Sequence, residues 1–268
     1  MIPLMSESAE HAGGPTVLLQ LSDLHLGARA GEPEERLARA VDAAAELRPK
    51  PLAVLLSGDV ADEPAAAVYA RAHAIVARLG IPIHAIPGNH DDRDLLAMSF
   101  AGRERPTGAP VHVLAYVGAL RLVGCDTSVP GSPGGALDDE QLDWLSATLA
   151  GEPARPTLLA LHHPPVASGI LAMDGMGLAA ADAGRLESLL ADHPQVLAVT
   201  SGHVHRTFAT EFARRPLLGC PSTNSTLRLD LRREEGLPLT FPEQPLGFAV
   251  HALVAGRLLS HVQALEAR

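Results

Sequence analysis

Residues of the kinds that bind divalent metal ions recur in five short motifs along this chain of 268 residues. The motifs are Asp23-x-His25, Gly58-Asp59, Gly88-Asn89-His90-Asp91, His162-His163-Pro164-Pro165 and Gly202-His203-Val204-His205. Carboxylate and amide oxygens combined with imidazole nitrogens form a donor set that suits divalent Zn, Mn, Fe or Co. We therefore predict a metal site without sulfur ligands. Such a site supports hydrolysis by a metal-activated water.

The spacing within the motifs favours convergence on one pocket. In Asp23-x-His25 and His203-x-His205, alternate residues of an extended segment are expected to point to the same side, so each pair presents two groups together. A glycine precedes both Asp59 and Asn89, and it allows the backbone to turn sharply and bring the polar side chain close. Seven other histidines lack such a setting and are expected to be ordinary surface or core residues: His11, His73, His84, His112, His193, His251 and His261.

The elements that must position these motifs are short apolar runs alternating with helical patterns, which is typical of stacked sheets covered by helices. Expected strands are 16–21, 52–57, 82–86, 111–115, 120–124, 157–161 and 196–200, and expected helices are 34–47, 64–79, 138–149 and 180–192. After Gly202 the pattern becomes β-rich, with candidate strands at 207–212, 217–220, 225–231, 247–254 and 258–263. Ligands bind beyond the carboxyl ends of strands in α/β sheets, so we expect the five motifs to meet there.

The pattern predicts one main domain over residues 15–268, preceded by a disordered stretch over residues 1–14. Residues 128–136 and 166–178 are rich in glycine or proline and are interpreted as loops that either shape a site rim or simply connect elements at the surface. Residues 233–245 carry three prolines. They are expected to form a lid, a dimer arm or a solvated loop.

Composition excludes several classes of partner. The chain has 31 acidic and 21 basic residues, a formal net charge of −10, so it has no general attraction to nucleic acid polymers or anionic membranes. No run of 18 apolar residues and no secretory signal pattern occurs, which predicts a cytoplasmic location. The two cysteines, Cys125 and Cys220, are expected to be small core residues.

The five motifs span residues 23–205 and resemble those of the calcineurin-like metallophosphoesterase superfamily. Four stretches further resemble its bacterial branch of cyclic-nucleotide and glycerophosphodiester phosphodiesterases, the class III type: residues 88–93, the double-His double-Pro, Met173-Asp174 with Gly177-Leu178, and residues 202–206. The resemblance implies an α/β fold, a four-layer α/β/β/α sandwich with the site at one sheet edge, here followed by a β-rich C-terminal part. It also suggests a homodimer or higher oligomer.

The resemblance implies a binuclear metal centre. It assigns one divalent ion to Asp23, His25 and His205, and the other to Asn89, His162 and His203. Asp59 would bridge the two ions. His90 would lie just outside them, where it binds phosphate or protonates the leaving group.

Three residues beside the motifs have open roles. In the resembling family the ligand is the histidine two before the proline, which is His162, and His163 is the alternative. Arg93 and Arg206 adjoin motifs and either touch substrate or form structural salt bridges.

These residues predict a phosphodiesterase. Two divalent ions about 3.5 to 4 Å apart can generate a bridging hydroxide that attacks phosphorus in line. A compact acidic chain suits small phosphodiesters better than nucleic acid polymers, and the resemblance points to glycerophosphodiesters or 3′,5′-cyclic nucleotides. Met173-Asp174 and Gly177-Leu178 resemble the glycerophosphodiesterase side of the branch, and the low aromatic content, 3%, offers few rings for a purine pocket. Glycerophosphodiesters are therefore slightly favoured. The alternatives are a phosphomonoesterase, which needs extra positive groups for the second charge, and a non-catalytic metal-dependent binding module.

Overall fold

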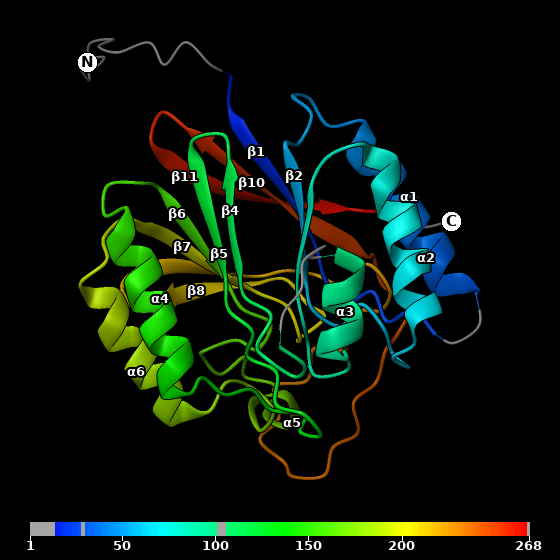
Figure 1. Cartoon of the computed structure of the whole chain (residues 1–268). Coiled ribbons are helices and arrows are strands. Elements are labelled where there is room, and N and C mark those ends of the chain that lie inside the picture. The colour runs from blue at the N-terminus through cyan, green and yellow to red at the C-terminus, as the bar shows by residue number, and fades with distance from the viewer. Residues whose placement is uncertain (1–13, 28–29, 101–105, 267–268) are drawn as a thin grey trace, which may run out of the picture.

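The computed structural model describes residues 14–27, 30–100 and 106–266. The disordered stretch expected at residues 1–14 lies, apart from Gly14, outside the described residues. Two β-sheets form the centre of the molecule (Figure 1).

The first sheet has the order β11-β10-β1-β2-β3. Its strands are β1 (Thr16–Leu21), β2 (Ala53–Ser57), β3 (Ile83–Ile86), β10 (Gly247–Val254) and β11 (Arg257–Ala264). β1, β2 and β3 run parallel, whereas β10 is antiparallel to both β1 and β11. Every residue of β1 and β2 is buried, as expected for parallel strands that are covered on both faces.

The second sheet has the order β4-β5-β6-β7-β9-β8. Its strands are β4 (Val113–Val117), β5 (Leu120–Gly124), β6 (Thr157–Ala160), β7 (Val196–Ser201), β8 (Phe208–Phe212) and β9 (Arg215–Gly219). The four inner strands are parallel, and β4 and β8 are antiparallel edges.

Helices cover the outer face of each sheet (Figure 1). On the first sheet lie α1 (Glu32–Ala45), α2 (Ala66–Val76), continued by a 3₁₀ turn, and α3 (Arg93–Phe100). On the second lie α4 (Asp139–Gly151) and α6 (Ala180–Ala191). α4 begins at the expected cap, because the Asp138 side chain accepts a hydrogen bond from the Gln141 backbone N–H.

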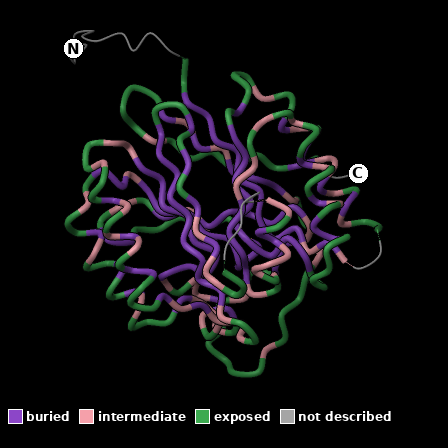
Figure 2. The backbone as a smooth tube through the Cα atoms, in the orientation of Figure 1, coloured by how far each residue is buried: buried purple, intermediate pink, exposed green. Residues whose placement is uncertain are grey.

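Three apolar cores separate the layers, and the alternation of side chains along each strand creates them. In β1 and β2, Leu18 and Leu55 pack between the sheets, whereas Leu19 and Leu56 pack under the helices. A third core lies between the second sheet, α4 and α6. Figure 2 shows the buried strands running through the middle, with exposed residues on the outer faces. The expected four-layer α/β/β/α sandwich is confirmed.

Three elements differ from the expectation. The strand predicted at 225–231 is wrong: the described chain from 221 to 246 contains no strand. In this segment Leu227 lies in a small apolar cluster, whereas Leu229 and Leu231 are more than half exposed. We call residues 225–246 the arm. Two helices were not predicted. One is the short α5 (Leu171–Asp174), within the stretch 166–178 that was interpreted as a loop. The other is α3, whose start is capped by the Asp92 carboxylate, which accepts hydrogen bonds from the backbone N–H groups of Asp94 and Leu95.

A buried histidine on β10 links two strands of the first sheet, β1 and the edge strand β11. His251 on β10 donates from Nε2 to the Gln20 side-chain oxygen at 2.8 Å, and its Nδ1 lies 2.8 Å from the Ser260 hydroxyl of β11. These partners suit the neutral imidazole. Burial lowers the pKa of His251 to about 4.

We expect this histidine to make the fold acid-sensitive. Unfolded His251 takes up a proton below about pH 6.5, whereas the folded form stays neutral down to about pH 4. The unfolded state therefore binds more protons in this window, and the wild type loses up to roughly 3 kcal/mol as the pH falls through it. Urea unfolding at pH 7 and pH 4.5 measures the difference in unfolding free energy between wild type and His251→Gln. We expect the lower pH to change this difference in favour of the variant. A difference that does not change with pH would contradict this prediction.

Candidate metal centre

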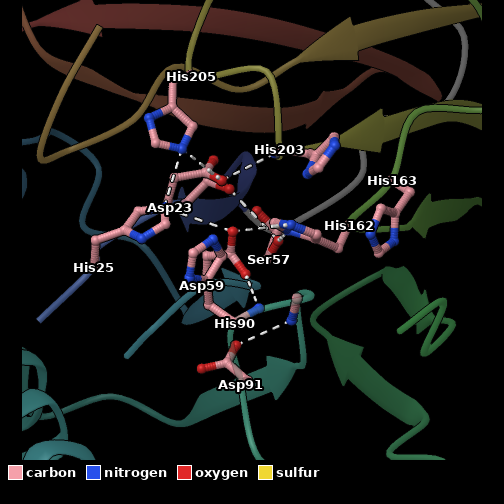
Figure 3. Close-up of polar contacts among 12 residues, drawn as sticks. Asp23, His25, Ser57, Asp59, His90, Asp91, His162, His163, His203 and His205 are labelled. Carbon is pink, nitrogen blue, oxygen red and sulfur yellow. Dashed lines mark hydrogen bonds and ion pairs between the residues drawn. The ribbon is translucent and has the colours of Figure 1, made fainter. Parts of the chain in front are cut away.

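The five motifs occupy the loops that follow the carboxyl ends of strands from both sheets. Figure 3 shows their side chains converging from these loops. Asp23 and His25 follow β1, Asp59 follows β2, Asn89 and His90 follow β3, His162 and His163 follow β6, and His203 and His205 follow β7. Convergence at the carboxyl ends of parallel strands was predicted, and the structure brings these residues together.

The loops reach this arrangement through left-handed backbone turns. The φ angles are 53° at Asp23, 46° at His25, 52° at Asp59, 70° at His203 and 55° at His205. The interpretation of the two His-containing pairs as extended segments is therefore wrong, because strand alternation does not aim these side chains. Left-handed conformations cost residues with a side chain about 1–3 kcal/mol and concentrate at functional sites.

Glycines allow the loops to touch one another. A Cβ atom on Gly58 would lie 2.2 Å from His162 Nδ1, and one on Gly88 would lie 2.1 Å from Asp59 Oδ1. Gly58 also has a φ of 98°, so it needs both space and a left-handed conformation. At Gly88 the requirement is space beside the Asp59 carboxylate.

Replacing Gly88 by alanine is expected to weaken metal binding roughly 10- to 100-fold, an effect like that of losing an outer-shell partner. The added methyl group must displace the Asp59 carboxylate or its backbone, and we expect overpacking to reduce stability by about 1–3 kcal/mol. The matched control is Gly184→Ala in α6, where an added Cβ meets nothing within 4 Å. Competition with a chelating dye and urea unfolding would test both variants, and unchanged metal affinity in Gly88→Ala would oppose this account.

One group of potential ligands consists of Asp23, His25, Asp59 and His205, whose ligand atoms lie within 4.8 Å of one another. His25 Nε2 lies 3.0 Å from His205 Nε2 and 3.5 Å from Asp59 Oδ2. The other ring nitrogens are occupied: His205 Nδ1 lies 2.9 Å from the Ser225 hydroxyl, and His25 Nδ1 lies 3.2 Å from Asp62 Oδ1. Such outer contacts orient imidazoles so that Nε2 faces a metal.

A second group lies on the other side of Asp59. His162, His163 and His203 also have ligand atoms within 4.8 Å of one another. His162 Nε2 lies 3.3 Å from Asp59 Oδ2, and its Nδ1 donates to the Ser57 carbonyl at 2.8 Å. Asp59 therefore stands between the two groups, in contact with a histidine from each.

Buried polar atoms without hydrogen-bond partners accumulate at this centre. They are Asp23 Oδ2, Asn89 Oδ1, His162 Nε2, His163 Nε2 and His203 Nε2. Buried polar atoms are normally satisfied, and all five are of types that ligate metals. Divalent cations fit these residues, because they would satisfy the oxygen and nitrogen lone pairs together.

The charges of the cluster are strongly coupled. Burial favours neutral Asp59, but the charge of His162, whose Nε2 lies 3.3 Å away, holds the pKa of this carboxyl well below its usual range. Burial also disfavours charged His162, yet Asp59 raises the pKa of this imidazole to about 9. Burial and the charge of His162 lower the pKa of His203 to about 4. A metal ion binds deprotonated ligands, so it would take the place of the proton on His162.

His90 lies at the exposed rim of the cluster. Its side chain is 41% exposed, and its Nδ1 lies 3.3 Å from Asp62 Oδ1. Its backbone N–H donates to Asp59 Oδ1 at 2.9 Å. Asp62 thus contacts both His25 and His90. It was not among the predicted site residues, although its position three residues after Asp59 could have indicated it.

Asp91 joins two of the loops. Its carboxylate accepts hydrogen bonds from the backbone N–H groups of Val60, Ala61 and Gly88 and from the Tyr69 hydroxyl, at 3.0 to 3.1 Å. This fixes the loop after β2 against the loop after β3, which bear Asp59 and Asn89.

The three residues with open roles have partners in the structure. His163 is fully buried, its Nδ1 lies 2.8 Å from the Thr127 hydroxyl, and burial holds its pKa well below the usual range. Arg93 Nε lies 2.7 Å from Asp126 Oδ2. Arg206 donates to the side-chain oxygen of Gln244 in the arm at 3.1 Å. Both arginines therefore hold loops.

A cavity of about 600 Å³ opens above the cluster, a size typical of small-molecule sites. Its lining includes His25, Asp59, Asn89, His90, His203 and His205. Within the described part of the chain, the residues that line it include no lysine or arginine.

No helix in the described part of the chain is both long and apolar enough to cross a membrane.

Comparison with known proteins places this geometry in context. Residues 16–207 match the family model of calcineurin-like phosphoesterases. The chain is 40% identical to the "Probable cyclic nucleotide phosphodiesterase" of Synechococcus sp. over 63% of its length and 64% of that protein, which is just under two thirds of the relative. It is 34% identical to the "Probable glycerophosphodiester phosphodiesterase" of Arcobacter nitrofigilis, over 70% of this chain and 69% of that protein.

A third relative is a 3′,5′-cyclic adenosine monophosphate phosphodiesterase of Pseudomonas aeruginosa, 33% identical over 77% of this chain and 76% of that protein. Among solved structures, purple acid phosphatase from yellow lupin has a TM-score of 0.59 at 15% identity, covering 94% of this chain and 52% of that one. The anchor in the inner membrane complex of Plasmodium has a TM-score of 0.63 at 13% identity, covering 95% and 89%. These structures share the fold.

Proposed function

Because this chain belongs to the calcineurin-like phosphoesterase family, we propose that it hydrolyses small phosphodiesters with two divalent metal ions bound at the cluster around Asp59. The family implies divalent metal ions. The observation that carries the proposal is the set of unsatisfied buried ligand atoms on both sides of that carboxylate.

We assign the ligands in two groups that share Asp59. One ion takes Asp23, His25 and His205, and the other takes Asn89, His162 and His203. Between His162 and His163, we choose His162 because its Nε2 lies beside Asp59 and its Nδ1 is held by the Ser57 carbonyl. The mixed oxygen and nitrogen donors suit Mn, Fe, Co or Zn.

The bound ions would supply an activated water and neutralise charge on the phosphate oxygens. The chain's own residues then do the rest. Asn89 is a neutral ligand, so it leaves more of the metal's charge available to the phosphate. As water adds to phosphorus and one P–O ester bond breaks, His90 gives its proton to the departing alkoxide, and the products are a phosphomonoester and an alcohol. Asp62 holds the His90 ring through Nδ1.

The lining of the cavity favours diesters over monoesters. A monoester carries a second negative charge, which needs additional cationic groups, and the described residues that line this cavity include neither lysine nor arginine. Arg93 and Arg206, the two arginines beside the motifs, hold loops instead. The relatives named for cyclic nucleotides and for glycerophosphodiesters support the same class. The alternative is a non-catalytic metal-dependent binding module, and detectable turnover would exclude it.

The test is hydrolysis of glycerophosphocholine, 3′,5′-cAMP and a phosphomonoester by protein loaded with manganese or zinc, with a chelated control. We expect turnover of at least one diester, and we expect the chelator to abolish it. Preference for the monoester would overturn the proposal. Absence of turnover from protein shown to hold two metal ions per chain would favour the binding module. The cytoplasmic location and the assembly into a homodimer or higher oligomer remain predictions.

A further inference from the structure

One wall of the cavity above the metal cluster is apolar. Met173, Met176, Leu227, Leu239 and Phe241 line it. The two methionines come from α5 (Leu171–Asp174) and the turn that follows it, and the other three come from the arm. Figure 1 shows α5 and the arm at the same end of the molecule, and a Cβ on Gly169 would lie 3.3 Å from the Leu231 side chain. Two segments outside the five motifs therefore build this wall.

The wall is attached to the metal centre. Met173 and Leu227 are buried with Ile170 and Val204 in a small apolar cluster separate from the three main cores, and Met176 packs on it. Val204 stands between His203 and His205 in the sequence. The apolar cluster thus continues directly into a loop that carries two of the assigned ligands.

Phe241 completes the wall beside that loop. Its ring centroid lies 5.6 Å from that of His205, at an interplanar angle of 52°. The residue is 51% exposed although it is a large aromatic, and it lines the cavity. An aromatic ring left open next to a phosphate site is suited to stack against a flat group on the substrate.

The chemistry of the wall identifies that group. Thioethers and an aromatic ring make favourable contacts with flat, polarizable rings. A quaternary ammonium group is recognised by a cage of several aromatic rings, whereas Phe241 is the only phenylalanine, tyrosine or tryptophan among the cavity-lining residues that the structure describes. A neutral planar ring fits better than a choline cation.

We propose that Phe241, with Met173 and Met176, forms a nucleobase subsite that makes nucleoside phosphodiesters preferred substrates. This inference rests on the proposed phosphodiesterase function and narrows it. It reverses the slight preference for glycerophosphodiesters drawn from Met173-Asp174. Met173 lies in the apolar wall. The Asp174 carboxylate has a structural role, because it accepts hydrogen bonds from the Ser168 backbone N–H and hydroxyl.

The test compares ligands that differ only in the base. For turnover, the pair is 3′,5′-cAMP and methyl riboside 3′,5′-cyclic phosphate. For binding, the pair is AMP and ribose 5-phosphate, titrated calorimetrically into manganese-loaded protein. We expect the wild type to favour the base-containing member about 10-fold or more in both kcat/KM and Kd. We expect Phe241→Ala to lower that preference roughly 5- to 30-fold, the usual effect of removing a stacking ring. Phe241→Trp should retain it.

The matched control is Leu229→Ala, which removes an arm side chain of similar exposure, 54%, that is not among the residues lining the cavity. It should keep the wild-type preference. Equal binding of AMP and ribose 5-phosphate by the wild type, or equal loss on both members of each pair in Phe241→Ala, would overturn the subsite while leaving the phosphodiesterase proposal intact. A Phe241-dependent preference for AMP in protein that hydrolyses no diester would support the subsite and count against the proposed function instead.

Discussion

Asp59→Asn is expected to lower diester turnover by well over 100-fold and to leave at most one metal ion per chain. One carboxylate oxygen of Asp59 lies 3.5 Å from His25 Nε2 and 3.3 Å from His162 Nε2, so the same side chain serves both proposed ion positions. Loss of an outer-shell partner alone typically costs 10- to 100-fold. Loss of a shared ligand should weaken metal binding further, because the asparagine amide is uncharged and binds both ions less strongly.

Metal content after dialysis and kcat on a diester measure the two effects separately. The matched control is Asp42→Asn, an aspartate on α1 that pairs with Arg78 at the surface, and it should retain both ions and full turnover. If Asp59→Asn kept two ions per chain, Asp59 would not be the bridging ligand. Full metal content with low turnover would instead assign Asp59 a role in positioning His90, because the Asp59 carboxylate accepts a hydrogen bond from the His90 backbone N–H.

The convergence of the site could be predicted because it follows from topology. Parallel strands place their carboxyl ends at one edge, and Asp23, Asp59 and His162 each lie two residues after the end of such a strand. The layers were likewise predictable from alternation, which sends Leu18 and Leu19 to opposite faces of one sheet. Both inferences use only the period of the strands and their order along the chain.

The backbone of the site was not predictable by the same means. The left-handed φ angles of Asp23, His25 and His205 contradict local preference, since residues with a Cβ rarely adopt them. Contacts between loops hold these conformations, such as the hydrogen bond from the His203 N–H to Asp23 Oδ1 at 3.0 Å across 180 residues. Local sequence carries no record of contacts at such separation.

The apolar wall was missed for a related reason. The leucines at 227, 229 and 231 alternate as in a strand, and the low aromatic content argued against a base-binding site. The tertiary structure places Phe241, 36 residues after the last motif, next to His205. A single aromatic ring in the right place matters more for recognition than the aromatic content of the whole chain.

His90→Ala is expected to lower kcat by about 10²- to 10⁴-fold for diesters with an alkoxide leaving group, the range for loss of a general acid. Bis(p-nitrophenyl) phosphate, whose leaving group departs without a proton, should lose much less. His90 is 41% exposed at the cluster, its Nδ1 lies 3.3 Å from Asp62, and it lines the cavity. Its ring is thereby oriented without being one of the assigned ligands, so the metal content should not change.

The dependence on leaving group separates the two roles implied for His90. If His90 protonates the leaving oxygen, the loss follows the basicity of that oxygen and KM changes little. If it binds phosphate instead, both kinds of diester lose similar amounts and KM rises. Equal activity of wild type and His90→Ala on 3′,5′-cAMP would exclude both roles. His261→Ala on the exposed edge strand β11 is the control. Asp62→Asn should reproduce part of the leaving-group-dependent loss, because Asp62 holds the His90 ring. Its metal content is measured as well, because Asp62 also contacts the assigned ligand His25.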